Sequence, residues 1–306
     1  MPELPEVETV VRGLNRKVRG LKIKDVWSDW PKYFKPHLSL FKFKKHVVGK
    51  KINIVHRRGK NILFNLSDGH VLLIHQKMTG HLLIGNWIYN PKGDGRTRTS
   101  GFWRPVSHGP LQDPRNDFIH LMFFLNNGRQ LALSDARKFA KVLCGPREEI
   151  FGKKDISSLG PEPLDAGFAF EKFKDLFKNK KGRIKQVIMD QNFIVGIGNI
   201  YSDDILYSAK VHPLSRVENL PDSILKKIYK ATRTILQKAI RLGGTSIDDF
   251  RNIDGKKGYY DKARLVYQKE KCPKGHFIKR IRVGGRTASF CSKEQRIYKG
   301  LTKSKN

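Results

Sequence analysis

Cysteine is scarce in this sequence. The chain has 306 residues and three cysteines, Cys144, Cys272 and Cys291. Three thiols are too few for the disulfide framework that holds many small secreted domains together. Reduced thiols or metal ligation are therefore favoured as the use of these side chains.

Long apolar runs are also absent. No run in the sequence approaches the roughly 18 consecutive apolar residues that a membrane-spanning helix needs. The opening residues 1–4 lack the basic and apolar segments of a secretory signal. We therefore expect a cytoplasmic, nucleoid-associated protein that does not bind membranes.

Acidic side chains are outnumbered by basic ones. The chain has 61 Lys and Arg against 28 Asp and Glu, which gives a formal net charge of +33. A polyanionic partner is the simplest explanation of so basic a chain, although charge alone leaves open a surface of solvated lysines. Because the charge is spread along the chain and not gathered on one amphipathic helix, nucleic acid is favoured over membrane.

Two spacings of apolar residues divide the chain. A helical spacing over residues 5–18 is followed, from about 52 to 142, by short apolar runs that hairpin turns separate. This pattern predicts a sandwich-like or barrel-like β domain that opens with one helix. From about 168 to 242 the spacing is helical again, and short strands return near the end. The expected fold class is α+β with two domains.

Changes in composition indicate where the segments meet. We expect an N-terminal catalytic β-sandwich domain over residues 1–146, a linker over 147–163, a helical domain over 164–260, a zinc-finger-like hairpin over 261–297 and a frayed tail over 298–306. Residues 90–116 are polar and rich in Gly, Pro and Arg, which predicts a long loop.

The second residue points to a specific chemistry. Removal of Met1 would leave Pro2 with a free secondary amine, which titrates near pH 8 and is partly neutral at physiological pH. Such an amine can attack a sugar C1′ and form an iminium, which acidifies the C2′ proton and permits strand cleavage. Glu3 and Glu6 lie beside it, where the start of a helix stabilises carboxylates. The plainer alternative is an ordinary helix-start signal.

Several motifs, in one order over nearly the entire chain, resemble those of the formamidopyrimidine-DNA glycosylase family. They are MPELPEVET at residues 1–9, RGKNILF at 58–64, KMTG at 77–80, DARKF at 135–139, GIGNIYSDD at 196–204, GGTS at 243–246, DGKKGY at 254–259 and GRT at 285–287. The resemblance implies a helix–two-turn–helix motif in the second domain. It also implies a DNA glycosylase/AP lyase of base excision repair that acts as a monomer on damaged double-stranded DNA.

The resemblance assigns the chemistry to the start of the chain. Pro2 would form a Schiff base, and β,δ-elimination would follow without a catalytic cofactor. Glu3 would be the general acid/base that helps to open the sugar ring. Glu6 would position the damaged nucleotide or a water molecule. Lys60 would contact the phosphate next to the lesion, whereas a lysine of a basic protein more often lies on a solvated surface.

DNA contacts are implied for a second group of residues. An enzyme that acts on C1′ must flip the base out of the duplex, and apolar side chains with an arginine can fill the gap. Met78, Arg137 and Phe139 match these insertion residues; the alternative is two core side chains and a surface arginine. Phosphate contacts are implied for Asn199, with Lys185 and Tyr201 as weaker candidates, and for Arg286.

The last segment departs from the family, most members of which carry a four-cysteine zinc finger there. Lys274 and Glu294 stand where the second and fourth cysteines belong, and Cys272 is one residue out of register. One interpretation is an altered site of Cys272, His276, Cys291 and Glu294. The other is a zincless hairpin held by packing, which the sequence favours because carboxylates are uncommon in structural zinc sites.

Two further functions stay open on the sequence. Leu4, the insertion residues and the 243–246 loop favour oxidised purines such as 8-oxoguanine and formamidopyrimidines as substrates. An endonuclease VIII-like enzyme for oxidised pyrimidines is the alternative in the same class. A catalytically inactive, basic DNA-binding protein is the alternative in another class. The presence of Pro2, Glu3, Glu6 and Lys60 argues against it.

Overall fold

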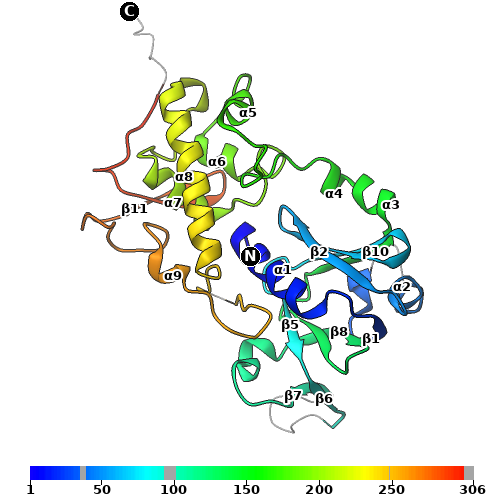
Figure 1. The fold of residues 1–306 in the computed structure, drawn as a ribbon. Helices are drawn as coiled ribbons and strands as arrows, with labels where there is room; N and C mark the ends of the chain where they lie inside the picture. The colour runs from blue at the N-terminus through cyan, green and yellow to red at the C-terminus, as the bar shows by residue number, and fades with distance from the viewer. Residues whose placement is uncertain (35–38, 93–100, 248, 300–306) are drawn as a thin grey trace, which may run out of the picture. The chain divides into compact units, whose positions relative to one another are not determined.

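The computed structural model describes residues 1–34, 39–92, 101–247 and 249–299. The chain divides into two units: unit 1 is Met1–Ser157 with Gly243–Tyr259, and unit 2 is Ser158–Leu242 with Tyr260–Asn306. Figure 1 labels their elements. Among the described residues, no helix combines the length and the apolar character that crossing a membrane requires.

Unit 1 opens with the predicted helix, α1 (Leu4–Val18). Val7, Leu14 and Val18 are fully buried and lie on one face at the spacing of an amphipathic helix. A proline stands in the first turn, where the missing N–H costs nothing. The Glu6 carboxylate accepts a hydrogen bond of 2.8 Å from the backbone N–H of Glu3, which fixes the first turn.

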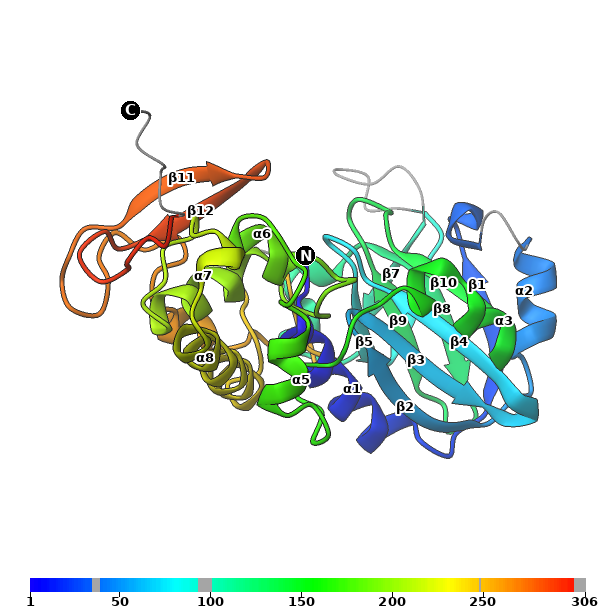
Figure 2. The same ribbon diagram turned by 90° about the horizontal axis from the view of Figure 1, so that it is seen from above.

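Two four-stranded antiparallel sheets form the body of unit 1, as the sequence predicted. Their strand orders are β1-β8-β9-β5 and β10-β4-β3-β2, and Figure 2 shows β2, β3 and β4 side by side. The strands are β1 (Ile23–Ser28), β2 (Ile52–Arg58), β3 (Asn61–Leu66), β4 (His70–His75), β5 (His81–Gly85), β8 (Ile119–Leu125), β9 (Gln130–Ser134) and β10 (Lys141–Pro146).

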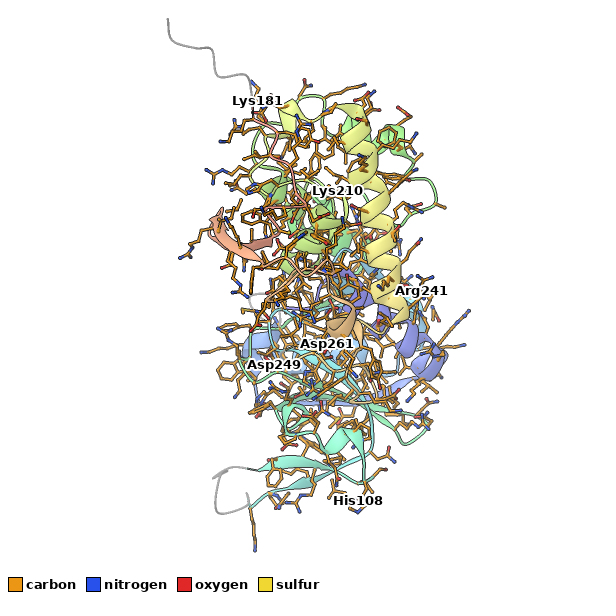
Figure 3. The ribbon with its side chains drawn as sticks, turned by 90° about the vertical axis from the view of Figure 1, so that its left-hand side faces the viewer. His108, Lys181, Lys210, Arg241, Asp249 and Asp261 are labelled. Atoms are coloured by element: carbon orange, nitrogen blue, oxygen red, sulfur yellow. The ribbon has the colours of Figure 1, made fainter. Side chains whose placement is uncertain are left out.

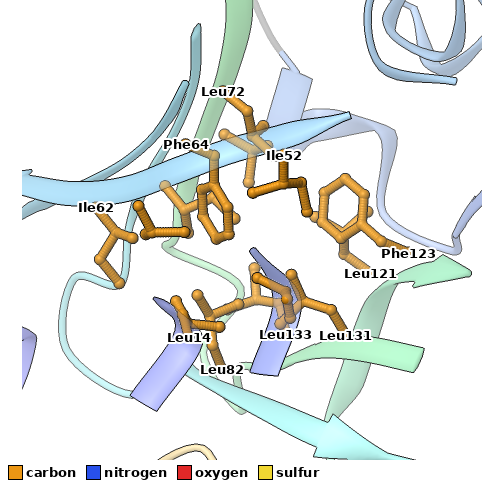
Figure 4. Close-up of a cluster of buried hydrophobic side chains, with 14 of the residues drawn as sticks. Leu14, Ile52, Ile62, Phe64, Leu72, Leu82, Leu121, Phe123, Leu131 and Leu133 are labelled. Carbon is orange, nitrogen blue, oxygen red and sulfur yellow. The ribbon is translucent and has the colours of Figure 1, made fainter. Parts of the chain in front are cut away.

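The core of unit 1 lies between the two sheets. Figure 4 shows Phe64 and Leu72 of one sheet facing Leu82 and Leu133 of the other, with Leu14 of α1 among them. All five are fully buried. Each such side chain contributes about 1.5–3 kcal/mol relative to an exposed one. The β-sandwich with its N-terminal helix is thereby confirmed.

The sequence missed some local structure in unit 1. The missed elements are η1 (Pro31–Phe34), α2 (Leu40–Val47), α3 (Arg147–Gly152) and α4 (Lys154–Ser157). The turn expected at residues 67–69 is present as η2 (Ser67–Gly69), between the paired strands β3 and β4. The loop expected over 90–116 is wrong in part, because β7 (Phe102–Pro105) pairs with β6 (Trp87–Asn90), and η3 (Pro110–Gln112) and η4 (Pro114–Asn116) follow. Trp103 packs edge-on against Trp27 at 5.3 Å between ring centroids, a contact that local sequence does not reveal. Residues 93–100 lie outside the described part.

Unit 2 is helical, as expected. Its helices are α5 (Phe170–Asp175), α6 (Ile184–Met189), α7 (Asn199–Ser208), η5 (Val217–Asn219), α8 (Asp222–Arg241) and α9 (Tyr260–Ala263). The hairpin β11 (Lys279–Val283) and β12 (Arg286–Phe290) completes it. Basic side chains are exposed on this unit, among them Lys181, Lys210 and Arg241 in Figure 3.

The segment Gly243–Tyr259 packs with unit 1, whereas the sequence placed it in the helical domain. The backbone N–H of Ile84 donates to the carbonyl of Ile253 at 2.8 Å. Arg251 is 2% exposed and its guanidinium lies 2.8 Å from the Asp113 carboxylate. These partners are distant in sequence, so local periodicity carried no sign of them.

Candidate active site

The N-terminal turn brings the candidate catalytic residues together. Pro2 is buried directly before α1, and Met1 is half exposed. Glu3 and Glu6 are 3% and 2% exposed. While Met1 is present, the nitrogen of Pro2 is an amide. Removal of the exposed methionine converts it into an amine beside two buried carboxyl groups.

Glu6 links this turn to the loop at 243–246. One carboxylate oxygen accepts from the Glu3 N–H at 2.8 Å, and the other accepts from the Thr245 N–H at 2.7 Å. Gly244 lies against Glu6 with a φ of +80°, and a Cβ there would stand 2.8 Å from the Glu6 carboxylate oxygen. The close approach and the left-handed backbone therefore both require glycine.

A second glycine supports the same loop. A Cβ on Gly258 would stand 2.2 Å from the carbonyl oxygen of Gly244. The N–H of Gly258 donates to the Ser246 hydroxyl at 2.9 Å. The motifs at 243–246 and 254–259 thus form one structure around Glu6, a connection that the sequence did not reveal.

Lys60 lies in the turn between β2 and β3 and is 7% exposed. Its charge, with that of Lys77, acts on His75 at the end of β4. Burial and these two cations lower the pKa of His75 to about 3. The imidazole is therefore neutral, and its Nδ1 accepts from the Lys77 N–H at 3.0 Å. The structure places Lys60 in a cationic region of unit 1.

The three candidate insertion residues are exposed and adjacent. Met78 is 47% and Phe139 is 54% exposed, and Arg137 is exposed as well. The guanidinium of Arg137 lies 3.4 Å from the sulfur of Met78 and 5.1 Å from the centroid of the Phe139 ring. Met78 and Phe139 are therefore not core side chains, which removes the alternative that the sequence left open.

A buried carboxylate fixes the two loops that carry these side chains. Asp135 is fully buried and accepts from the Thr79 hydroxyl, from the Ala140 N–H at 2.8 Å and from the Tyr33 hydroxyl at 3.3 Å. Burial and this contact raise the pKa of Tyr33 above its usual range. The Arg137 N–H donates to the Thr79 hydroxyl at 3.1 Å. Sequence reasoning missed this anchor, although Asp135 opens one of the quoted motifs.

In unit 2, Asn199 begins α7 directly after Gly198. Its side-chain oxygen is buried and meets no hydrogen-bond donor among the described residues, so that oxygen is not committed to holding the fold. Arg286 is exposed at the start of β12, next to the Gly284–Gly285 turn. The positions of Asn199 and Arg286 are therefore compatible with the phosphate contacts that the sequence predicted for them.

Lys185 and Tyr201 do not suit the phosphate contacts expected of them, because both are fully buried. The ammonium of Lys185 donates to the Asp203 carboxylate and to the Thr287 carbonyl, the latter at 3.1 Å. The ring of Tyr201 packs on that of Tyr260 at 5.2 Å between centroids. These side chains hold unit 2 together.

The residues of the altered-metal-site interpretation also lie together in unit 2. Ligand atoms of Cys272, His276 and Cys291 are all within 4.8 Å of one another. Glu294 is next to them, with one carboxylate oxygen 3.8 Å from Nδ1 of His276. The donor set fits a zinc ion by chemistry and by spacing.

Comparison with known proteins agrees with these motifs. Residues 1–142 match the formamidopyrimidine-DNA glycosylase N-terminal domain, and residues 159–251 match the formamidopyrimidine-DNA glycosylase H2TH domain. The chain is 38% identical over 301 residues to formamidopyrimidine-DNA glycosylase of Pelotomaculum thermopropionicum, covering 97% of this chain and 100% of that protein. It is 34% identical over 299 residues to that of Bacillus subtilis, covering 96% and 99%.

Solved structures of formamidopyrimidine-DNA glycosylase bound to DNA are also similar to this chain. The complex between the Lactococcus lactis FPG (MutM) and a Fapy-dG containing DNA is similar with a TM-score of 0.79 and 30% identity, covering 96% of this chain and 100% of that one. The complex between Lactococcus lactis Fpg and DNA that contains an abasic site is similar with a TM-score of 0.80 and 30% identity, covering 96% and 99%.

Proposed function

We propose that this chain, which belongs to the formamidopyrimidine-DNA glycosylase family, is a bifunctional DNA glycosylase/AP lyase that excises oxidised purines from double-stranded DNA. The observation that carries the proposal is the N-terminal turn, where Pro2 is followed by two buried carboxyl groups, one of them fixed on both oxygens. The related Lactococcus lactis proteins were captured with Fapy-dG and abasic-site DNA.

The proposed reaction begins after Met1 is removed. The amine of Pro2 attacks C1′ of the everted nucleotide, a C–N bond forms, and the bond from C1′ to the damaged base breaks with its electron pair leaving on the base. The proton of the Pro2 nitrogen passes to the departing base. Glu3 delivers a proton to O4′, the bond between C1′ and O4′ breaks, and an iminium between Pro2 and C1′ remains. Loss of the C2′ proton then expels the 3′ phosphate, and a second elimination expels the 5′ phosphate. No cofactor is needed in this reaction.

Glu6 acts as a positioning residue in this proposal. Both of its oxygens accept backbone hydrogen bonds, one within the N-terminal turn and one from the 243–246 loop. A carboxylate held on both oxygens in this way cannot rotate freely. It would therefore hold the damaged nucleotide, or a water molecule, in a constant place beside the Pro2 amine.

The exposed trio Met78, Arg137 and Phe139 would fill the gap that base eversion leaves. A mixed apolar and guanidinium surface can stack in the gap and hydrogen bond the orphaned base. Lys60, Asn199 and Arg286 would contact phosphates next to the lesion. The net charge of +33 supplies the general attraction to DNA. We propose that the protein acts as a monomer.

Borohydride trapping tests the proposal, because reduction of the iminium links the enzyme covalently to DNA. Protein with mature Pro2 should be trapped on duplexes that contain 8-oxoguanine or a formamidopyrimidine. Pro2→Gly should lose most excision, and Glu3→Gln should lose excision while it retains lesion binding. Glu8→Gln is the matched control, because Glu8 lies on the next turn of α1 and pairs with Arg12 and Arg57.

Other outcomes would replace the proposal. Trapping on oxidised pyrimidines alone would indicate an endonuclease VIII-like enzyme. Normal DNA affinity without trapping would indicate a DNA-binding protein that has lost catalysis. Excision by Glu3→Gln at the wild-type rate would remove the acid/base role from Glu3.

A further inference from the structure

Two short turns in unit 2 gather four side chains of the kinds that bind zinc. Cys272 and Cys291 are 4% and 0% exposed. Each sulfur lies 3.7 Å from Nδ1 of His276. An oxygen of Glu294 lies 3.8 Å from the same nitrogen. The imidazole nitrogen therefore faces two thiols and a carboxylate.

The distances from Nδ1 of His276 to the two sulfurs match those of a tetrahedral zinc site. With a Zn–S bond of about 2.3 Å and a Zn–N bond of about 2.0–2.1 Å, sulfur and nitrogen bound to one ion stand about 3.6 Å apart. The two observed separations of 3.7 Å need almost no adjustment. The carboxylate oxygen would move by about half an ångström to take the fourth position.

Backbone hydrogen bonds hold the ligands in place. The N–H of Cys272 donates to the carbonyl of His276 at 2.9 Å, so one turn presents both residues on the same side. The N–H of Glu294 donates to the carbonyl of Cys291 at 3.2 Å, which closes the second turn. The two ligand pairs are thus arranged by the backbone and not by flexible side chains alone.

Lys274 forms an ion pair with the carboxylate of Glu294. Its ammonium lies 2.8 Å from one oxygen of Glu294, and the other oxygen of that carboxylate faces His276. Carboxylates that bind metals are themselves commonly held by hydrogen bonds in this way. With Zn²⁺, two thiolates, one carboxylate and one ammonium, the formal charges sum to zero.

We propose that Cys272, His276, Cys291 and Glu294 bind one structural zinc ion and that Lys274 holds the carboxylate. This donor set differs from the four cysteines of most family members, and it reverses our preference from the sequence for a zincless hairpin. Carboxylates are uncommon in structural zinc sites as a general rule, but here the ligand atoms of Cys272, His276 and Cys291 already lie within 4.8 Å of one another. The ion would tie the turn at 272–276 to the turn that follows β12.

Metal analysis of the full chain tests the proposal. The protein is expressed in zinc-containing medium, purified and dialysed before the zinc content is measured. The wild type should carry one zinc per chain, and Cys272→Ser and Cys291→Ser should carry none. Cys144→Ser is the matched control, because this thiol is buried in unit 1 and should not affect the zinc content. A wild type without stoichiometric zinc, or with a disulfide between Cys272 and Cys291, would overturn the site.

Cobalt substitution tests the donor set separately. Co²⁺ in the wild type should give the visible absorption of a tetrahedral ion with thiolate ligands, and Glu294→Gln should change that spectrum and weaken binding. Lys274→Met should weaken binding by about 10-fold to 100-fold with the spectrum unchanged, as expected of a group that acts through a ligand. An unchanged spectrum and unchanged affinity in Glu294→Gln would remove Glu294 from the site. Circular dichroism of each variant reports whether unit 2 remains folded.

Discussion

Replacement of Gly244 by alanine is the most direct test of how Glu6 is positioned. The backbone at Gly244 has a φ of +80°, and the added Cβ would lie 2.8 Å and 2.9 Å from two atoms of the Glu6 side chain. It would also lie 3.2 Å from the Cα of Glu6, within the helix itself. The helix backbone cannot give way easily, so the carboxylate should move.

The expected magnitude has two parts. An L-residue in the left-handed region costs about 1–2 kcal/mol. Displacement of the carboxylate weakens the 2.7 Å hydrogen bond from the Thr245 N–H, and a hydrogen bond to a charged group contributes about 1.5–3 kcal/mol. We therefore expect Gly244→Ala to lose about 2.5–5 kcal/mol of unfolding free energy. A shift of about 1 Å in a positioning group should reduce excision by about 100-fold.

Denaturant unfolding and single-turnover excision on an 8-oxoguanine duplex measure the two effects. Gly49→Ala is the matched control, because Gly49 has a φ of +81° and no described atom lies within 4 Å of the position of its added Cβ. The control should lose about 1–2 kcal/mol and excise normally. Excision by Gly244→Ala at the wild-type rate, or equal losses of stability in both variants, would refute the reasoning.

The remaining predictions concern charge. The pKa of His75 is lowered to about 3 in the folded state, so the neutral imidazole contributes its full stability above about pH 6.5, and this contribution decreases as the pH falls toward 3. The free energy of unfolding can change by up to about 1.4 kcal/mol per pH unit in this range. Denaturant titrations at several pH values should show that His75→Asn flattens this dependence. Asp135→Asn should cost about 1.5–3 kcal/mol, because the amide cannot accept from both Thr79 and Ala140, and it should slow excision. Arg286→Ala should weaken DNA binding measured by fluorescence anisotropy. It should also reduce the slope of log binding constant against log salt concentration by about 1, the amount expected for one lost phosphate contact. An unchanged slope would place Arg286 away from the DNA backbone.

Much of the fold could be predicted because it follows from local patterns. The helical spacing of Val7, Leu14 and Val18 predicted α1, and short apolar runs with hairpin turns predicted the sandwich. The hairpin at β6 and β7 could not be found in this way. Its stability comes from aromatic packing that joins Trp103 to Trp27, and these residues are too far apart in sequence to form a pattern.

The same limit applies to the candidate site, where local motifs were visible in the sequence and long-range contacts were not. Motifs identified the side chains at the start of the chain, but they did not indicate what holds those side chains in place. Glu6 accepts its second hydrogen bond from Thr245, a residue 239 positions later in the chain. A contact of that range becomes visible only when the fold brings both segments into unit 1.

Lys185 and Tyr201 show why residue identity was insufficient for the DNA contacts. A lysine in a basic protein is usually exposed, but Lys185 pairs with Asp203, and that carboxylate also accepts from the Ser289 N–H at 2.8 Å. The next residue, Asp204, accepts from the Tyr260 hydroxyl at 2.9 Å. Two consecutive acids of the 196–204 motif therefore hold α6, α9 and β12 against α7. Part of the motif that suggested DNA binding is thus structural, and within α7 the proposed phosphate contact narrows to Asn199 at the start of the helix.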